Sequence, residues 1–403
     1  MSAENVRAEV GQIAPLDGLR GIAVAWVVLF HVYALRGKLG DPWVDLMASS
    51  PFLEPVVGAG YLGVDLFFLI SGFLLALPWF VHAGEGRPAP SAHGFYARRL
   101  RRIVPAYYVQ LVVLFAVVLP LLAGRGYWRS DLYVYIFNAV AHALFLHNTT
   151  PLTSGSMQMN GALWTLAVEA QFYLLIPLVA PLFVRWGYAA LAASFALAIL
   201  WHIGVQSGLD GLVAAEIAIG APWGWPESTV RYLLLHQLPS YLVHFALGVV
   251  LGRAWLAWRS LEQPRIERAL VAIGAACALA VLYRLVAING LLLGELSWIV
   301  PPLCLGVLLF WAVTTRIRAA YALLARGPLA FLGRVSYSAY LYHLPLLLLW
   351  NAYARALPAW ASLPLYFAIL IAISWLSWRF VEQPFLRRKV VSGTTFRGAE
   401  SRT

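Results

Sequence analysis

Charged residues are scarce in this sequence. Only 12% of its 403 residues are Asp, Glu, Lys or Arg, whereas 61% are hydrophobic, and a soluble protein would carry roughly twice that share of charge. Nearly continuous apolar runs of membrane-spanning length recur along the chain. A backbone in lipid must form its hydrogen bonds within each segment. The sequence therefore predicts an all-α, polytopic membrane protein.

Cysteine is almost absent as well. The two cysteines, Cys277 and Cys304, lie inside apolar runs, which is typical of small buried side chains and offers neither a disulfide framework nor zinc-ligand spacing. No phosphate-binding glycine loop, dinucleotide fingerprint or metal-ligand motif is present. The net charge of +11 does not indicate a nucleic-acid partner, because the basic residues gather at the ends of apolar segments. We expect no metal site and no permanently bound cofactor.

Hydropathy and the positions of Arg, Pro and Gly predict about ten membrane-spanning helices. The predicted spans are residues 16–36, 61–81, 101–123, 163–184, 188–206, 231–252, 268–287, 295–315, 328–350 and 363–383. The apolar stretch 131–147 is shorter and contains Asn138, His142 and His147, so it is interpreted as an interfacial or re-entrant helix. The first run lacks a preceding cleavage site and is expected to be a retained span rather than a signal peptide.

Lysine and arginine are distributed unevenly over the predicted loops. With the N-terminus in the cytoplasm, 22 of these 29 residues fall on the cytoplasmic side and 7 on the outer side. This bias follows the positive-inside rule and predicts a multi-pass protein of the cell (cytoplasmic or inner) membrane with both termini cytoplasmic. No internal repeat or Gly/Ser linker divides the chain. We therefore expect one membrane domain over residues 1–388 and a short, polar, disordered tail over 389–403.

Ionisable side chains within apolar spans are costly and therefore indicate function. Arg20 and His31 lie eleven residues apart in the first span, hence on one helix face and roughly 16 Å apart along the axis. Glu169 in the fourth span can lie at the depth of His31. A carboxylate there would orient a histidine that acts as a general base. The alternative is a buried polar contact that joins two helices.

Four arginines, Arg98, Arg99, Arg101 and Arg102, crowd the start of the third span. Arg99 and Arg102 are three residues apart and share a helix face. A helix N-terminus favours anions over cations, so this cluster is unfavourable unless an anion compensates it. Phosphate fits, because guanidinium groups match its oxygens bidentately. A contact with lipid headgroups is the alternative interpretation.

Other polar and aromatic residues in the spans are candidates for lining a substrate site. Ser71 can instead bond back to its own helix, and Trp164 can belong to an aromatic belt at the membrane surface. His343 fits a site and a structural role equally well. The candidates for substrate lining are Asp65, Ser71, Trp164, Tyr173 and His343.

Taken together, these motifs resemble those of the acyltransferase-3 family of integral membrane O-acyltransferases. The family pattern begins with a basic residue, ten residues and a histidine, which match Arg20 and His31. The resemblance runs from about residue 13 to 388, with the motifs in the family's order. The other matching segments are Gly63–Phe73, Arg99 with Arg102, Trp164–Tyr173, Ser336–His343 and Val381–Pro384. A fused C-terminal hydrolase-like domain, present in some members, is not found.

The resemblance implies transfer of an acyl group, often acetyl, from cytoplasmic acyl-CoA to a sugar hydroxyl of a surface glycan, glycolipid or glycosylated metabolite. It implies that Arg99 and Arg102 hold the CoA phosphates, with Arg20 assisting. His31 would be the general base, oriented by Glu169, and an acyl-histidine intermediate is the competing mechanism.

A proton-coupled transporter or flippase is the alternative function, because an intramembrane His–Glu pair also suits proton movement. Against it stand the absence of inverted repeats and of Gly/Pro-broken helices in matching halves.

Overall fold

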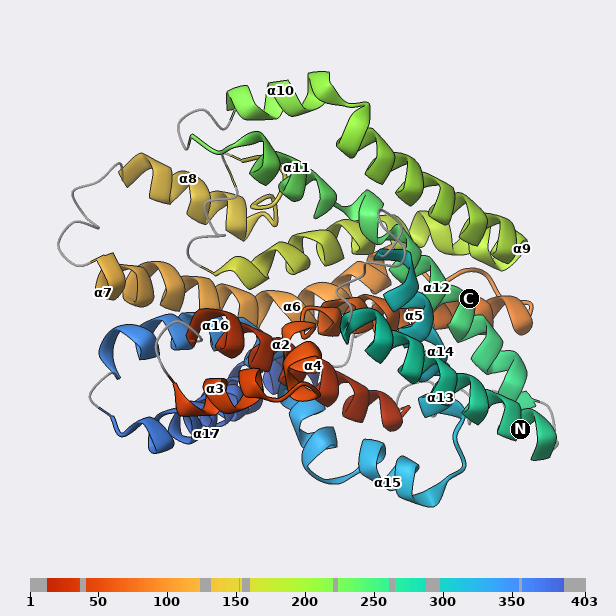
Figure 1. Ribbon diagram of the computed structural model, residues 1–403. Helices are drawn as coiled ribbons and strands as arrows, with labels where there is room; N and C mark the ends of the chain where they lie inside the picture. Colours follow the sequence, from red (N-terminus) through yellow and green to blue (C-terminus); the bar gives the residue numbers. More distant parts are fainter. Residues whose placement is uncertain are drawn as a thin grey trace, which may run out of the picture.

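The computed structural model describes residues 13–36, 41–123, 132–151, 153, 160–219, 224–260, 265–287, 298–354 and 357–387. Every regular element within these ranges is helical (Figure 1), which confirms the predicted all-α class. The tail expected over residues 389–403 lies outside the described residues. The α-helices are α2 (Pro15–Arg36), α3 (Pro42–Ser49), α4 (Leu53–Gly58), α5 (Leu62–Gly84), α6 (Ala92–Val113), α7 (Leu119–Ala123), α8 (Leu132–Ala143), α9 (Trp164–Ser207), α10 (Asp210–Ile219), α11 (Glu227–Leu235), α12 (Leu238–Ser260), α13 (Arg265–Ala287), α14 (Val300–Thr314), α15 (Arg318–Ala325), α16 (Gly327–Tyr353), α17 (Ala359–Ser377) and α18 (Gln383–Leu386).

Seven helical stretches of the described chain are long and apolar enough to cross a membrane, or eight if the bent pair Val300–Thr314 and Arg318–Tyr353 is one span. One of the seven contains α9, which has 44 residues and non-helical backbone at Trp186. A straight helix of that length would measure about 66 Å, roughly twice the hydrocarbon core. Figure 1 shows its two arms folded back at a sharp bend.

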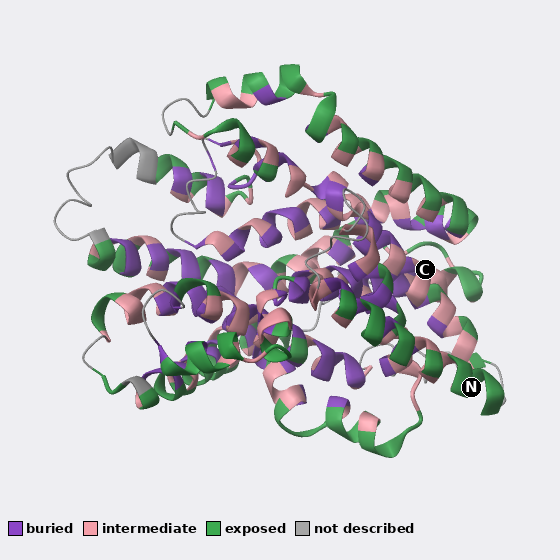
Figure 2. Ribbon diagram, viewed as in Figure 1, coloured by how far each residue is buried: buried purple, intermediate pink, exposed green. Residues whose placement is uncertain are grey.

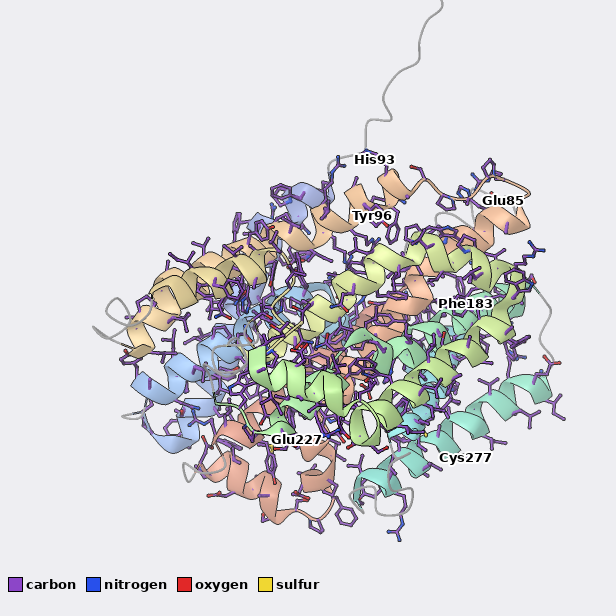
Figure 3. The ribbon with its side chains drawn as sticks, turned by 90° about the horizontal axis from the view of Figure 1, so that it is seen from above. Glu85, His93, Tyr96, Phe183, Glu227 and Cys277 are labelled. Atoms are coloured by element: carbon purple, nitrogen blue, oxygen red, sulfur yellow. The ribbon has the colours of Figure 1, made fainter. Side chains whose placement is uncertain are left out.

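The described parts of the ten predicted spans are mainly helical, the two arms of α9 carry the fourth and fifth, and the sixth crosses the break between α11 and α12. The polytopic membrane class is therefore confirmed, while the number ten and the cytoplasmic termini stay predictions. In Figure 3, Glu85 at the end of α5 and His93 in the first turn of α6 lie at one edge, and Glu227 at the start of α11 lies toward the opposite edge.

The stretch predicted as interfacial or re-entrant forms the short helix α8, which has 12 residues and packs beside α6. The hydroxyls of Tyr107 and Tyr108 on α6 donate to the carbonyls of His142 and Ala143, each at 2.9 Å. His142 and His147 are fully buried. At ~1.5 Å per residue α8 is too short to cross a bilayer.

The centre of the molecule is formed by α2, α5, α12 and α16, with α9 against α12 and α5. Figure 2 shows buried residues concentrated where these helices meet. Two contacts need glycine, because a Cβ on Gly333 of α16 would overlap the Asp17 carbonyl of α2, and one on Gly248 of α12 would overlap the Leu69 carbonyl of α5. Small residues of this kind let membrane helices approach backbone to backbone. The close approach brings the polar residues of α2, α5 and α16 together.

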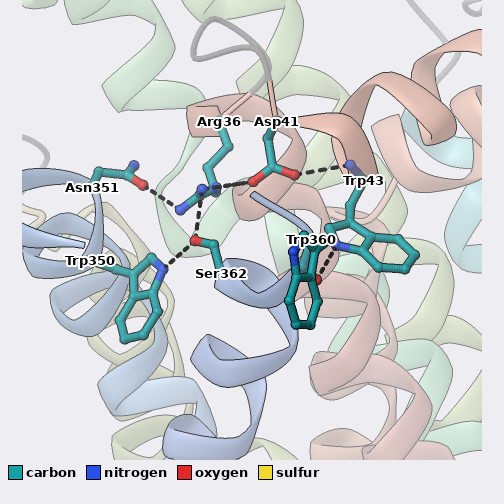
Figure 4. Close-up of polar contacts among 7 residues, drawn as sticks. All are labelled: Arg36, Asp41, Trp43, Trp350, Asn351, Trp360 and Ser362. Carbon is teal, nitrogen blue, oxygen red and sulfur yellow. Dashed lines mark hydrogen bonds and ion pairs between the residues drawn. The ribbon is translucent and has the colours of Figure 1, made fainter. Parts of the chain in front are cut away.

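A buried ion pair fixes the C-terminal end of α2 (Figure 4). Arg36 Nε donates to Asp41 at 2.8 Å, and its other nitrogens donate to Asn351 on α16 at 3.1 Å and Ser362 on α17 at 3.3 Å. Ser362 also accepts a hydrogen bond from Trp350 Nε1. This network ties α2 to α16 and α17, and thereby holds the helix that carries His31.

Candidate active site

A cavity of about 100 Å³ lies between α2, α5, α6, α9 and α16. Among the described residues, Glu169 is its one acidic lining residue, whereas three arginines, Arg20, Arg99 and Arg102, line it. We call it the arginine cavity. Ser71, Thr165, Tyr173, Tyr337 and Tyr340 are among its other lining residues.

Glu169 is held by two hydroxyl groups. Its Oε1 accepts hydrogen bonds from Ser71 Oγ at 2.6 Å and from Tyr173 OH at 2.5 Å. Tyr173 lies one turn further along α9, whereas Ser71 reaches across from α5. Ser71 therefore joins two helices, contrary to the alternative that it bonds back to its own helix. These contacts satisfy one carboxylate oxygen inside the membrane-spanning region.

The arginines of this cavity have few partners. Within the described part of the chain, Arg20 pairs with Asp17 alone, at 3.4 Å. Arg99 packs over the Phe95 ring at 5.8 Å, and its Nε is buried without a hydrogen-bond partner. Arg102 makes no hydrogen bond or ion pair with any described residue. Three half-buried guanidinium groups thus line the same cavity as one carboxylate, an excess of positive charge that is unfavourable unless an anion compensates it.

His31 lines a second cavity, of about 660 Å³, which we call the His31 cavity. Its Nδ1 lies 2.9 Å from the Val27 carbonyl and 3.3 Å from His343 Nε2. His343 Nδ1 lies 2.6 Å from the Tyr340 carbonyl. A carbonyl only accepts hydrogen bonds, so the network assigns the proton of each neutral ring to Nδ1. His31 Nε2 then carries a lone pair and has no partner among the described residues.

The expected hydrogen bond between His31 and Glu169 is absent. His31 pairs with His343, and Glu169 pairs with Ser71 and Tyr173. The depth of a residue in its span does not determine which way it faces, and the two side chains line different cavities. The cavities adjoin, however, because Val64 and Tyr340 line both.

Tyr340 stands at the junction of the two cavities. Its hydroxyl lies 2.8 Å from Thr165 Oγ1 and donates to the Ala162 carbonyl at 2.9 Å, at the start of α9. Trp164, the neighbour of Thr165, lines the His31 cavity. The Trp164 ring packs edge-on against His236, with ring centres 4.7 Å apart. Its contacts are therefore with the site rather than only with a membrane-surface belt.

Asp65 has a partner that sequence reasoning missed. Its Oδ1 lies 3.4 Å from Nε2 of His244, and both side chains are largely buried. A third cavity, of about 520 Å³, contains this pair, and we call it the His244 cavity. It shares Asp65, Tyr61, His236 and Tyr241 with the His31 cavity. His236 and His244 both fall in the predicted span 231–252, so the rule that flagged His31 would also have found them.

No group of three or more His, Cys, Asp or Glu side chains in the described part of the chain is arranged to hold a metal ion. The polar side chains that line the cavities include arginine, histidine, carboxylate and hydroxyl groups. An anion would be held on one side, and a histidine with a free nitrogen faces the larger cavity on the other.

Comparisons with known proteins identify the family of the chain. Residues 13–379 match the family model of an acyltransferase domain, acyltransferase-3. No solved structure matches the chain.

Three relatives are similar along most of the chain. A Staphylococcus aureus protein named "Putative O-acetyltransferase" is 24% identical over 398 residues, which cover 94% of this chain and 58% of the relative. BcsY of Komagataeibacter xylinus, named as a membrane-bound transacylase, is 28% identical over 383 residues, or 91% and 81% of the two chains. The peptidoglycan O-acetyltransferase OatA of Listeria monocytogenes is 26% identical over 407 residues, or 94% and 57%.

The chain thus spans little more than half the length of the Staphylococcus and Listeria relatives. The family model covers the helices that carry the arginine cavity and both histidine cavities. This chain belongs to the acyltransferase-3 family of membrane acyltransferases.

Proposed function

We propose that this protein is an O-acyltransferase of the cell membrane, which moves an acetyl or other acyl group from cytoplasmic acyl-CoA to a sugar hydroxyl. The observation that carries the proposal is the pair of adjoining cavities, one rich in arginine and one lined by His31, with Tyr340 between them. The names of the O-acetyltransferase and transacylase relatives support the same reaction. The acceptor would be a surface glycan, a glycolipid or a glycosylated metabolite.

The arginine cavity suits the donor. Arg99, Arg102 and Arg20 have guanidinium groups without full compensation, and the phosphates of CoA would supply the missing negative charge. A volume of about 100 Å³ is well below the roughly 300–1,000 Å³ of a typical ligand pocket. The cavity would therefore admit the thioester end of the donor, while the nucleotide stays at its mouth against the arginines.

His31 would activate the acceptor. Its Nε2 would take the proton of the sugar hydroxyl while the hydroxyl oxygen attacks the thioester carbonyl carbon. The carbon–sulfur bond would then break, and the proton would pass to the departing CoA thiolate. Positioned bases of this kind contribute roughly 10²–10⁴-fold in rate. His343 would act as a positioning residue, because it accepts from Nδ1 and leaves Nε2 free.

An acyl-histidine route would use the same nitrogen. Nε2 would attack the thioester carbon, CoA would leave, and the acceptor hydroxyl would then take the acyl group from Nε2. Double-displacement kinetics would identify this route, whereas a general base requires donor and acceptor to be bound together. Either way the free Nε2 of His31 is the reacting atom of the protein.

The decisive experiment measures transfer by purified protein in lipid nanodiscs, with radiolabelled acetyl-CoA and a glycan extract as acceptor. We expect transfer without any solute gradient, which a pure transporter would not perform. His31→Ala should abolish it, while His82→Ala, which changes a histidine outside these cavities, should not. Full transfer by folded His31→Ala protein would remove His31 from the chemistry.

A further inference from the structure

We propose that the His31 and His244 cavities select an acceptor without negative charge, namely a neutral sugar or an amino sugar, and that Asp65 and His244 bind it. This inference rests on the proposed acyl transfer and narrows its acceptor. It joins three features of the two cavities: the sign of their charge, their aromatic lining and one buried nitrogen without a partner.

The charge of these cavities is opposite to that of the arginine cavity. Neither lysine nor arginine lines them among the described residues, whereas Asp65 lines both and Glu54 lines the His244 cavity. A carboxylate or phosphate on the acceptor would lose its hydration beside Asp65 with no basic partner in reach. Repulsion between like charges weakens the binding of an acceptor that carries the wrong charge. An uncharged or amine-bearing acceptor escapes that penalty.

The aromatic lining suits sugar rings. Tyrosine and tryptophan offer a flat apolar face together with a polar atom, which matches the mixed surface of a carbohydrate. Trp164 and Tyr241 pack against each other, with ring centres 5.3 Å apart. The aromatic residues of the His31 cavity are Phe30, Tyr61, Trp164, Tyr232, Tyr241 and Tyr340.

The Asp65–His244 pair adds a requirement for a hydrogen-bond donor. Asp65 lies 3.4 Å from His244 Nε2 and so places the proton of the neutral ring on that nitrogen. Nδ1 is then an acceptor, and it is buried without a hydrogen-bond partner, in a residue only 3% exposed. Such an atom requires a donor from water or a ligand. A sugar hydroxyl or amine can donate to it, whereas an ionised carboxylate cannot.

The test uses two acceptors that differ at one group, octyl glucuronamide with a neutral amide and octyl glucuronide with a carboxylate, and octyl glucoside is the reference. Release of CoA from acetyl-CoA above the acceptor-free rate is measured with the purified protein in nanodiscs. We expect the rate of CoA release with the amide acceptor to exceed the rate with the acid acceptor by at least about tenfold. If only octyl glucoside reacts, the two are compared as inhibitors of its acetylation, with the same order expected.

Substitutions distinguish the effect of Asp65 itself from the effect of removing a negative charge elsewhere in the protein. Asp65→Asn should narrow the preference for the amide, and His244→Leu should weaken use of the neutral acceptor. Asp210→Asn removes a carboxylate that pairs with Arg231 on α11, away from both cavities, and should change nothing. Equal use of acid and amide by the wild type, or an unchanged preference in Asp65→Asn, would overturn the inference.

Should no glycoside react, the acetylated sugar is identified in the glycans of the expressing cells by mass spectrometry. We expect the acetyl group on a neutral or amino sugar. Its location on a uronic acid or a phosphorylated sugar would contradict the inference and leave the acyl transfer standing. A complete lack of transfer from acetyl-CoA, in cells and in nanodiscs, would instead refute the proposed function itself.

Discussion

His31 on α2 and His343 on α16 are hydrogen-bonded to each other, with 3.3 Å between Nδ1 of the first and Nε2 of the second. Each ring also reaches a backbone carbonyl of its own helix, Val27 or Tyr340. In many enzymes a carboxylate holds the catalytic histidine. Beside His31, the base we propose, lies instead a second, fully buried histidine.

This pairing predicts a graded series of His343 variants. His343→Leu removes one of the two acceptors beside His31 Nδ1 and leaves the Val27 carbonyl, so kcat should fall by roughly 10–100-fold, part of the ~10²–10⁴-fold effect of a positioned base. The KM values should change little, because His343 does not line either histidine cavity. His343→Gln keeps a side-chain acceptor and should recover much of the loss. Steady-state kinetics check this, and equal loss in both variants would indicate a purely structural role.

The arginine cavity predicts a selective effect on the donor. Arg99→Ala or Arg102→Ala should raise the KM for acyl-CoA by roughly 10–100-fold, the value of a charge-assisted hydrogen bond of ~1.5–3 kcal/mol. Arg98→Ala is the matched control, because Arg98 belongs to the same helix but does not line the cavity. Donor and acceptor KM values are measured separately. If both rise equally, the arginines support folding rather than CoA binding.

Glu169 is predicted to act on the arginine cavity and on stability rather than directly on His31. Glu169→Ala leaves the hydroxyls of Ser71 and Tyr173 without their acceptor, so the free energy of unfolding should fall by about 1–3 kcal/mol. Glu169→Gln keeps an acceptor for Ser71 and Tyr173 and should cost less. Thermal unfolding in detergent measures both. A change in the kcat pH profile of folded Glu169→Gln would instead show coupling to His31.

The buried pair of His142 and His147 predicts loss of stability in acid. Burial lowers the pKa of His142 to about 4 and that of His147 to about 3, and their rings are stacked 4.3 Å apart. Because the unfolded chain binds protons first, stability is fully present above pH 6.5 and falls as the pH drops toward 4 and then 3. The slope approaches about 1.4 kcal/mol per histidine per pH unit.

Thermal unfolding between pH 8 and 4 tests this prediction. Both histidines lie outside the predicted membrane-spanning helices. The double variant His142→Asn, His147→Gln should flatten the pH dependence, and the control His82→Gln, at a half-buried histidine, should not. An identical acid slope in the double variant would assign the effect to other groups.

Much of the architecture could be predicted without the structure. Low charge and recurrent apolar runs specify membrane helices through the cost of unpaired backbone groups in lipid, and the described parts of the predicted spans are mainly helical. Helix-breaking residues also act locally, so the sequence alone could distinguish the short stretch 131–147 from the membrane-spanning helices. The motif residues were found for a local reason too, since Arg20, His31, Asp65 and Glu169 are ionisable groups in apolar runs.

What the sequence by itself determined is therefore the class of the protein, its helices and the residues that carry chemistry. Only the tertiary structure decided which of these residues meet: His31 with His343, Glu169 with Ser71, and Asp65 with His244. Span boundaries specify the depth of a side chain along its helix. The rotation of each helix, and its neighbours across the bundle, follow from close packing of segments hundreds of residues apart, such as Asp17 against Gly333. Local patterns carry no information on that packing.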